Sequence, residues 1–156
     1  NLPSERFGAP LNACTAALDA LEALKSVHIV ATSRWYESAP VPASDQPWYI
    51  NGVVQVETDL APLVLLQTLH KIEAQFGRVR TVPNAPRVLD LDLLAYGGTL
   101  LDGEGGHIPH PRLENRAFVL LPLSDIAPAW VHPRTGRALA EMVAKLPKDQ
   151  VCRALQ

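Results

Sequence analysis

The stretch Gly77–Leu94, GRVRTVPNAPRVLDLDLL, places a basic loop directly before an acidic segment. Residues Val88–Leu93 alternate between apolar and acidic side chains, which predicts a β-strand. Residues two apart in a strand point to the same face, so we expect Asp90 and Asp92 to lie side by side with leucines on the buried face. Two adjacent carboxylates repel each other unless arginines or a divalent cation supply positive charge between them.

Three arginines, Arg78, Arg80 and Arg87, come before the aspartates. Mg²⁺ favours sites made of one or two carboxylates, several waters and substrate phosphates, and arginine binds phosphate with forked hydrogen bonds. We therefore interpret the stretch as a magnesium–nucleotide site. The alternative is a solvated basic loop followed by an edge strand whose charges discourage aggregation.

The composition describes an ordinary globular protein. The chain has 156 residues, is 47% hydrophobic and carries a net charge of −2, which predicts one domain over residues 1–156 with a substantial core. The small net charge argues against nucleic-acid binding. Cys14 and Cys152 form no metal-binding or disulfide pattern, and the sequence shows neither a membrane-spanning run nor a signal peptide. We expect a cytoplasmic protein.

Hydrophobic periodicity predicts an alternation of helices and strands. Apolar residues recur at helical spacing in Leu11–Leu24 and in Leu63–Phe76. Val27–Glu37 and Trp48–Glu57 read as strands that pair as an antiparallel hairpin around a proline-rich loop. The later elements that we expect are a short strand at Thr99–Asp102, a loop at Gly103–Arg112, a short helix at Ser124–Ala127 and a last helix that ends at Leu146.

This order is most of a βαββαβ pattern. It predicts an α+β fold, with a ferredoxin-like antiparallel sheet and helices packed on it as an α/β/α sandwich. The opening strand is absent before the first helix. Because its loss would leave neighbouring strands with unpaired backbone groups, we expect roughly ten further residues before Asn1 to form a central strand.

Two smaller groups of residues could bind a ligand. His107 and His110 lie in a Gly/Pro-rich loop, and without a third ligand nearby they are a weak zinc signal. His110 with Arg116 fits a phosphate better, although His110 can also simply bond its own loop. Tyr49 and Asn51 share a strand face, where a ring beside an amide suits a flat heterocycle, or else forms ordinary cross-strand packing.

Four motifs spread along the chain combine into a family pattern. They are Y-x-N at Tyr49 and Asn51, I-E-x-x-x-G-R-x-R at Ile72–Arg80, P-R-x-L-D-L-D at Pro86–Asp92, and I-P-H-P-R with N-R-x-F-V-L-x-P-L at Ile108–Leu123. Together they resemble the 6-hydroxymethyl-7,8-dihydropterin pyrophosphokinase family of folate biosynthesis. The resemblance covers essentially the whole chain. It implies a monomer that uses ATP and two Mg²⁺ ions to transfer pyrophosphate to the hydroxymethyl group of the pterin.

The resemblance also implies roles for individual residues. Asp90 and Asp92 would hold the two metal ions, and Asp92 would act in catalysis together with Arg78 and Arg87. The residues implied to bind ATP are Glu73, Arg78, Arg80, Arg87, His110 and Arg116. Those implied to bind the pterin are Tyr49 and Phe118 on its two faces, Asn51 at its edge, and Ala39 and Val41 lining the pocket.

Two further expectations concern the loop and a rival function. We expect Gly77–Pro86 to act as a lid over the ligands, although it lacks the tryptophan that some family members use there. The rival is a non-catalytic, ferredoxin-like nucleotide- or ligand-binding module. An RNA-binding module should present aromatic residues on a basic sheet, whereas this chain places acidic residues there.

Overall fold

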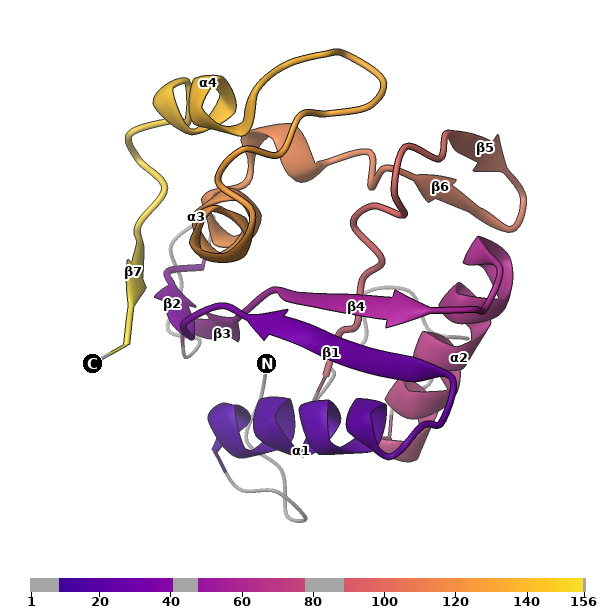
Figure 1. Ribbon diagram of the computed structural model, residues 1–156. Helices are drawn as coiled ribbons and strands as arrows, with labels where there is room; N and C mark the ends of the chain where they lie inside the picture. Colours follow the sequence, from indigo (N-terminus) through magenta and orange to yellow (C-terminus); the bar gives the residue numbers. More distant parts are fainter. Residues whose placement is uncertain (1–8, 41–47, 78–88, 156) are drawn as a thin grey trace.

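The computed structural model describes residues 9–40, 48–77 and 89–155, and its elements are labelled as in Figure 1. In the first half these are α1 (Pro10–Glu22), β1 (Val27–Thr32), β2 (Tyr36–Ser38), β3 (Tyr49–Asn51), β4 (Val54–Thr58) and α2 (Pro62–Gln75). In the second half they are β5 (Leu101–Gly103), β6 (Gly106–Ile108), the 3₁₀ helix η1 (Leu113–Asn115), α3 (Ala117–Ile126), α4 (Leu139–Ala144) and β7 (Cys152–Ala154).

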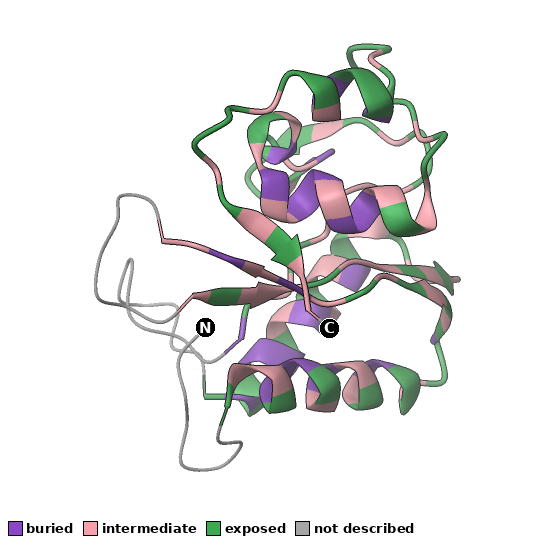
Figure 2. Ribbon diagram, turned by 90° about the vertical axis from the view of Figure 1, so that its left-hand side faces the viewer, coloured by how far each residue is buried: buried purple, intermediate pink, exposed green. Residues whose placement is uncertain are grey.

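All strand pairs among these elements are antiparallel. β1 pairs with β4, β2 pairs with both β3 and β7, and β5 forms a hairpin with β6. Helices lie on both sides of the strand layer, with α1 and α2 on one side and α3 and α4 on the other (Figure 2). The predicted α+β class is confirmed, because helices pack on antiparallel strands.

α1 and α2 occupy the stretches in which the sequence pattern predicts helices, and each buries one face. α1 and α2 each start with a proline, whose fixed φ suits the first helical turn and whose missing N–H would have had no partner there. Their apolar faces meet in one core cluster, which also holds Leu89. A second cluster joins α3, α4 and Leu113. None of the helices within the described ranges is long and apolar enough to cross a membrane.

The predicted hairpin strands are each broken in two, which corrects the expectation of two continuous strands. The breaks lie at residues 33–35 and 52–53. There the Ser33 N–H donates to the Val53 carbonyl, and the Val53 N–H donates to Ser33 Oγ, both at 2.9 Å. A Cβ on Gly52 would lie only 2.8 Å from the Trp35 ring. This close corner redirects both strands, so β1–β4 and β2–β3 belong to different sheets.

The predicted aspartate strand is not paired as a strand over its described part, residues 89–93. The Leu91 N–H donates to a side-chain oxygen of Glu73 at 2.8 Å instead of to a neighbouring strand. The alternation of burial is nevertheless present, because Leu89 is buried while both aspartates are exposed. The prediction was right about which side chains are buried and which are exposed, and wrong about hydrogen-bonded pairing with a neighbouring strand.

Three later predictions also need correction. The short helix expected at Ser124–Ala127 is the end of the longer α3, which contains the buried Pro122. The last helix ends at Ala144 instead of Leu146. The short strand is displaced to Leu101–Gly103 and pairs with β6, inside a segment expected to be a loop. β7 had no counterpart in the sequence pattern.

Candidate active site

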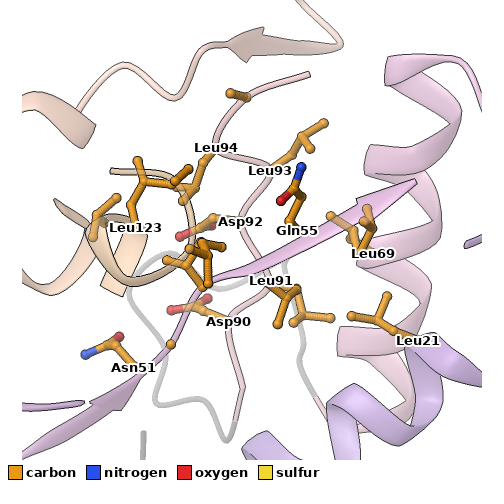
Figure 3. Close-up of a pocket in the computed structure, with 18 of the residues that line it drawn as sticks. Leu21, Asn51, Gln55, Leu69, Asp90, Leu91, Asp92, Leu93, Leu94 and Leu123 are labelled. Carbon is orange, nitrogen blue, oxygen red and sulfur yellow. The ribbon is translucent and has the colours of Figure 1, made fainter. Parts of the chain in front are cut away.

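A cavity of about 1310 Å³ lies between β4 and residues 89–98. Its wall is more apolar than polar, and α1, α2 and α3 contribute leucines to it, among them Leu21, Leu69 and Leu123 (Figure 3). Its lining contains six of the residues predicted for the site: Tyr49, Asn51, Asp90, Asp92, Arg116 and Phe118. The fold therefore brings the predicted metal, nucleotide and pterin residues into one space, although they come from three separate parts of the chain.

The two aspartates lie on the cavity side of an extended segment. Figure 3 shows the Asp90 and Asp92 side chains on the opposite side of the chain from Leu91, which points toward Leu69 and Leu21. Leu91 and Leu93 pack against the core cluster of α1 and α2, which anchors the segment. Packing of the leucines thus forces both carboxylates into the cavity, as the alternation predicts.

Glu73 supports this segment from α2. Its side chain is fully buried, and its Oε2 accepts the Leu91 N–H at 2.8 Å. Leu91 is the residue between the two aspartates, so the bond holds the peptide that connects them. A buried carboxylate requires such partners, because burying it without hydrogen bonds would be costly. Glu73 does not line the cavity itself.

His110, in the loop after β6, lies close enough to Asp92 to feel its charge. The backbone N–H of His110 donates to the Leu94 carbonyl at 2.8 Å, and the ring Nδ1 accepts the backbone N–H of Arg112 at 3.2 Å. Burial lowers the pKa of His110 from its usual 6.5, while the charge of Asp92 opposes this shift. The imidazole is therefore neutral at pH 7. Its Nδ1 is used as an acceptor, which leaves the proton on Nε2.

Arg116 and Phe118 lie at the start of α3. The Arg116 guanidinium carbon is 5.3 Å from the centre of the Phe118 ring, so the two side chains lie close together. Both are half-buried in the cavity wall. A cation beside an aromatic ring suits a ligand that combines negative charge with a flat ring.

Tyr49 and Asn51 are held in place by the pairing of β3 with β2. Asn51 lies opposite Tyr36 and donates from Nδ2 to Ser38 Oγ at 3.2 Å, while Tyr49 lies opposite Ser38. Ser38 is buried and was missed in the sequence analysis. Only the register of the β2–β3 hairpin identifies it as the partner of Asn51. Ala39 lies outside the cavity lining and donates its N–H to the Val151 carbonyl at 3.0 Å.

Four predicted site residues, Arg78, Arg80, Arg87 and Val41, lie outside the described residues, as does the expected lid apart from Gly77. Among the residues that the structure does describe, no group of three or more His, Cys, Asp and Glu side chains is close enough to hold a metal ion. Two adjacent carboxylates still fit Mg²⁺, which keeps several waters and is completed by substrate phosphates.

Comparison with known proteins agrees with this geometry. The model of the 7,8-dihydro-6-hydroxymethylpterin-pyrophosphokinase family matches residues 5–128. The 2-amino-4-hydroxy-6-hydroxymethyldihydropteridine pyrophosphokinase of Pseudomonas aeruginosa is 45% identical over 91% of this chain and 87% of its own length. The protein of the same name from Haemophilus influenzae is 42% identical over 86% of this chain and 83% of its own.

A longer relative is similar over most of this chain. The folic acid synthesis protein fol1 of Pneumocystis carinii is 43% identical over 83% of the chain, which corresponds to 18% of that protein. The fold, the site and these relatives define an enzyme class, the pyrophosphokinases, which are ATP-dependent diphosphotransferases. Within that class the chain belongs to the 7,8-dihydro-6-hydroxymethylpterin-pyrophosphokinase family, whose role is in folate biosynthesis.

Proposed function

We propose that the cavity transfers pyrophosphate from ATP to the hydroxymethyl group of 6-hydroxymethyl-7,8-dihydropterin, giving AMP and the pterin diphosphate. The observation that carries this proposal is the placement of Asp90 and Asp92 in one cavity with Tyr49, Asn51 and the Arg116–Phe118 pair. The carboxylates suit a metal–phosphate group, and the tyrosine, amide and phenyl groups suit a flat heterocycle.

The proposed roles follow the chemistry of each side chain. Asp90 and Asp92 would hold two Mg²⁺ ions, which when bound would neutralise the triphosphate. Neutral His110 can donate a hydrogen bond from Nε2, and Arg116 contributes fixed positive charge. The residues proposed to bind ATP are Arg78, Arg80, Arg87, His110 and Arg116 by contact, and Glu73 indirectly, through the segment that carries the aspartates. Tyr49, Phe118, Asn51, Ala39 and Val41 are proposed to bind the pterin.

The reaction itself requires mainly positioning and charge stabilisation. The hydroxymethyl oxygen attacks the β-phosphorus of ATP while the bond from that phosphorus to the AMP oxygen breaks. The hydroxyl proton would pass to Asp92, or to solvent where a bound metal ion lowers the pKa of the hydroxyl. Arg78 and Arg87 stabilise the charge that develops on the transferred group. Glu73 is fully buried, and its contact with the Leu91 N–H supports an indirect contribution, through the aspartate segment.

We also propose that the sheet is a ferredoxin-like sheet completed by an extended apolar segment, which fills the apolar part of the cavity between β4 and residues 89–94 and leaves the part around the Asp90 and Asp92 carboxylates to the ligands. One edge of β4 pairs with β1, and the other faces the cavity. Leucines from α1, α2 and α3 form the cavity walls, which suits a strand that is buried on both faces. Hydrogen exchange of the β4 amides that do not bond β1 tests this, since rapid exchange in the natural protein would contradict a neighbouring strand.

We also propose that the protein is a monomer in the cytoplasm. Its partners in this proposal are ATP and a pterin, and it binds neither nucleic acid nor membranes. The net charge of −2 supports the exclusion of nucleic acid. Size-exclusion chromatography with light scattering tests the oligomeric state. A stable dimer at micromolar concentration would contradict the monomer.

The decisive experiment measures ATP binding by calorimetry, with and without Mg²⁺ and the pterin, together with release of AMP. It uses the protein with any residues that precede Asn1 in its natural chain. We expect Mg²⁺-dependent ATP binding, and AMP formation only when the pterin is present. Tight binding without AMP formation would favour the non-catalytic binding module, and absence of ATP binding would overturn the proposal.

A further inference from the structure

The side chain of Gln150 joins two backbone groups that flank Arg116. Its Oε1 accepts the Ala117 N–H at 2.8 Å, and its Nε2 donates to the Asn115 carbonyl at 2.7 Å. Gln150 lies more than thirty residues further along the chain, in the segment between α4 and β7. A single planar amide therefore holds the main chain on both sides of a residue in the cavity wall.

This contact satisfies a group that the helix leaves without a partner. Ala117 is the first residue of α3, and the first N–H groups of a helix have no acceptor within it. Arg116, the N-cap residue, provides no side-chain hydrogen bond to the helix end in the described structure. Gln150 supplies the missing acceptor, and by also binding Asn115 it determines how the chain passes from η1 into α3.

The same C-terminal segment also contacts the opposite wall of the site. The Val151 carbonyl accepts the Ala39 N–H at 3.0 Å, immediately before β7 pairs with β2. On its other edge β2 pairs with β3, which carries Tyr49 and Asn51. Two consecutive residues, Gln150 and Val151, thus connect the start of α3 to the β2–β3 hairpin.

We propose that Gln150 is a positioning residue, which holds Arg116 and Phe118 at the correct distance from the β2–β3 wall. It lies beyond residues 5–128, the part that matches the family model. Which ligands are affected rests on the proposed function, whereas the backbone contact itself does not. A small displacement of Arg116 and Phe118 would misplace both the charge and the ring that face the ligands.

Glutamine suits this position because it combines one donor and one acceptor at the required length. Gln150→Met keeps the length and removes both hydrogen bonds. Gln150→Glu keeps an acceptor for Ala117, but its ionised carboxylate faces the Asn115 carbonyl without a donor. When protonated, the same carboxyl regains a donor, so lowering the pH should restore the contact.

The test compares these two variants with Lys148→Gln, which changes an exposed neighbouring residue. Hydrogen exchange of the Ala117 amide is measured without ligands, and the dissociation constants for Mg²⁺–ATP and the pterin are measured by calorimetry. We expect Gln150→Met to accelerate the exchange and to weaken ligand binding by about tenfold, because misplacement of binding groups is costly. Lys148→Gln should match the natural protein in both measurements.

The pH dependence of Gln150→Glu provides the readout that a purely structural role would not produce. Relative to the natural protein at the same pH, its affinity should improve between pH 7 and pH 4, because this range reaches the ordinary glutamate pKa of about 4.3 and the carboxyl gains a proton there. This comparison remains decisive if Gln150→Met fails to fold. Ligand affinities within twofold of the natural protein in both variants, whatever happens to their melting temperatures, would overturn the positioning role.

If the proposed function is wrong, the measurements give a different result from the one that contradicts the positioning role. In that case the natural protein would bind neither ATP nor the pterin before any variant is compared. The exchange of the Ala117 amide would still report on the contact. Unchanged exchange in Gln150→Met would show that Gln150 does not hold the start of α3, and that result would also overturn the inference.

Discussion

Asp90 and Asp92 owe their position to the residues between and beside them. Leu89, Leu91 and Leu93 are drawn into the core, and strict alternation then leaves both carboxylates in the cavity. The buried Glu73 adds a hydrogen bond to the Leu91 N–H and so restricts rotation of the connecting peptide. Two like charges are thereby held together without a strand on either side among the described residues.

Replacing either aspartate with alanine should therefore abolish activity without unfolding the protein. Asp90→Ala or Asp92→Ala removes a metal ligand, and we expect turnover to fall by several orders of magnitude. Because both side chains are exposed, the melting temperature should change little. The measurement is AMP release, with Asp19→Ala, an exposed aspartate on α1, as the matched control. Near-normal AMP release by either variant would contradict the assignment.

At the scale of elements, a polar cluster ties the β1–β2 connection to α3. Asp125 accepts hydrogen bonds from the Arg34 N–H and guanidinium at 3.0–3.2 Å, and from the Tyr36 hydroxyl at 3.0 Å. The Arg34 bond is the main cause that lowers the pKa of Asp125, and the Tyr36 bond adds to it, while partial burial opposes them. The cluster orients β2 against the helix that begins at Arg116 and Phe118.

Asp125→Asn should destabilise the protein in a pH-dependent way. A lowered carboxyl pKa in the folded state means that the stabilisation is present above the ordinary value of 3.8 and is lost as the pH falls through the folded-state pKa. We expect a loss of about 1 kcal/mol at pH 7, because the Arg34 side of the pair is exposed to solvent. Urea denaturation at pH 7 and pH 3 measures it, with Asp149→Asn as control. An equal loss at both pH values would refute the ionic contribution.

The corner between β3 and β4 depends on the absence of a side chain at Gly52. The Trp35 ring leaves only 2.8 Å for a Cβ there, so Gly52→Ala must displace the ring. We expect a destabilisation of about 1–3 kcal/mol and a shift in tryptophan fluorescence. Gly98→Ala, where no atom lies within 4 Å of the added Cβ, is the control. If both variants unfold at the same denaturant concentration, the close packing is not present in solution.

For the molecule as a whole, the cavity couples ligand binding to stability. A ligand that binds only the folded state at a hundred times its dissociation constant stabilises it by about 2.7 kcal/mol. We therefore expect ATP with Mg²⁺ to raise the melting temperature, and a further rise with the pterin. ATP with EDTA should have a much smaller effect, and Asp92→Ala should respond weakly. A shift that is unaffected by EDTA would argue against metal-dependent binding.

Several features of the whole molecule could be predicted from sequence, because they depend on local periodicity. The positions of α1 and α2 follow from the helical spacing of their apolar residues, and the exposure of Asp90 and Asp92 follows from alternation. The breaks at residues 33–35 and 52–53 could not be predicted. They arise from contacts such as Ser33 with Val53, which join residues that are distant in the sequence.

The sequence by itself determined the chemistry of this protein: the aspartate pair, the arginines before it and the motifs that indicate its family. These depend on residue type and short spacing, which are visible without a fold. Only the tertiary structure decided which groups hold the site together. Ser38 binds Asn51, Glu73 binds the Leu91 N–H and Gln150 bridges Asn115 and Ala117, and all three contacts join separate elements. Such partners carry no local signal, because a polar side chain can satisfy its hydrogen bonds in many places until the packing of the chain selects one.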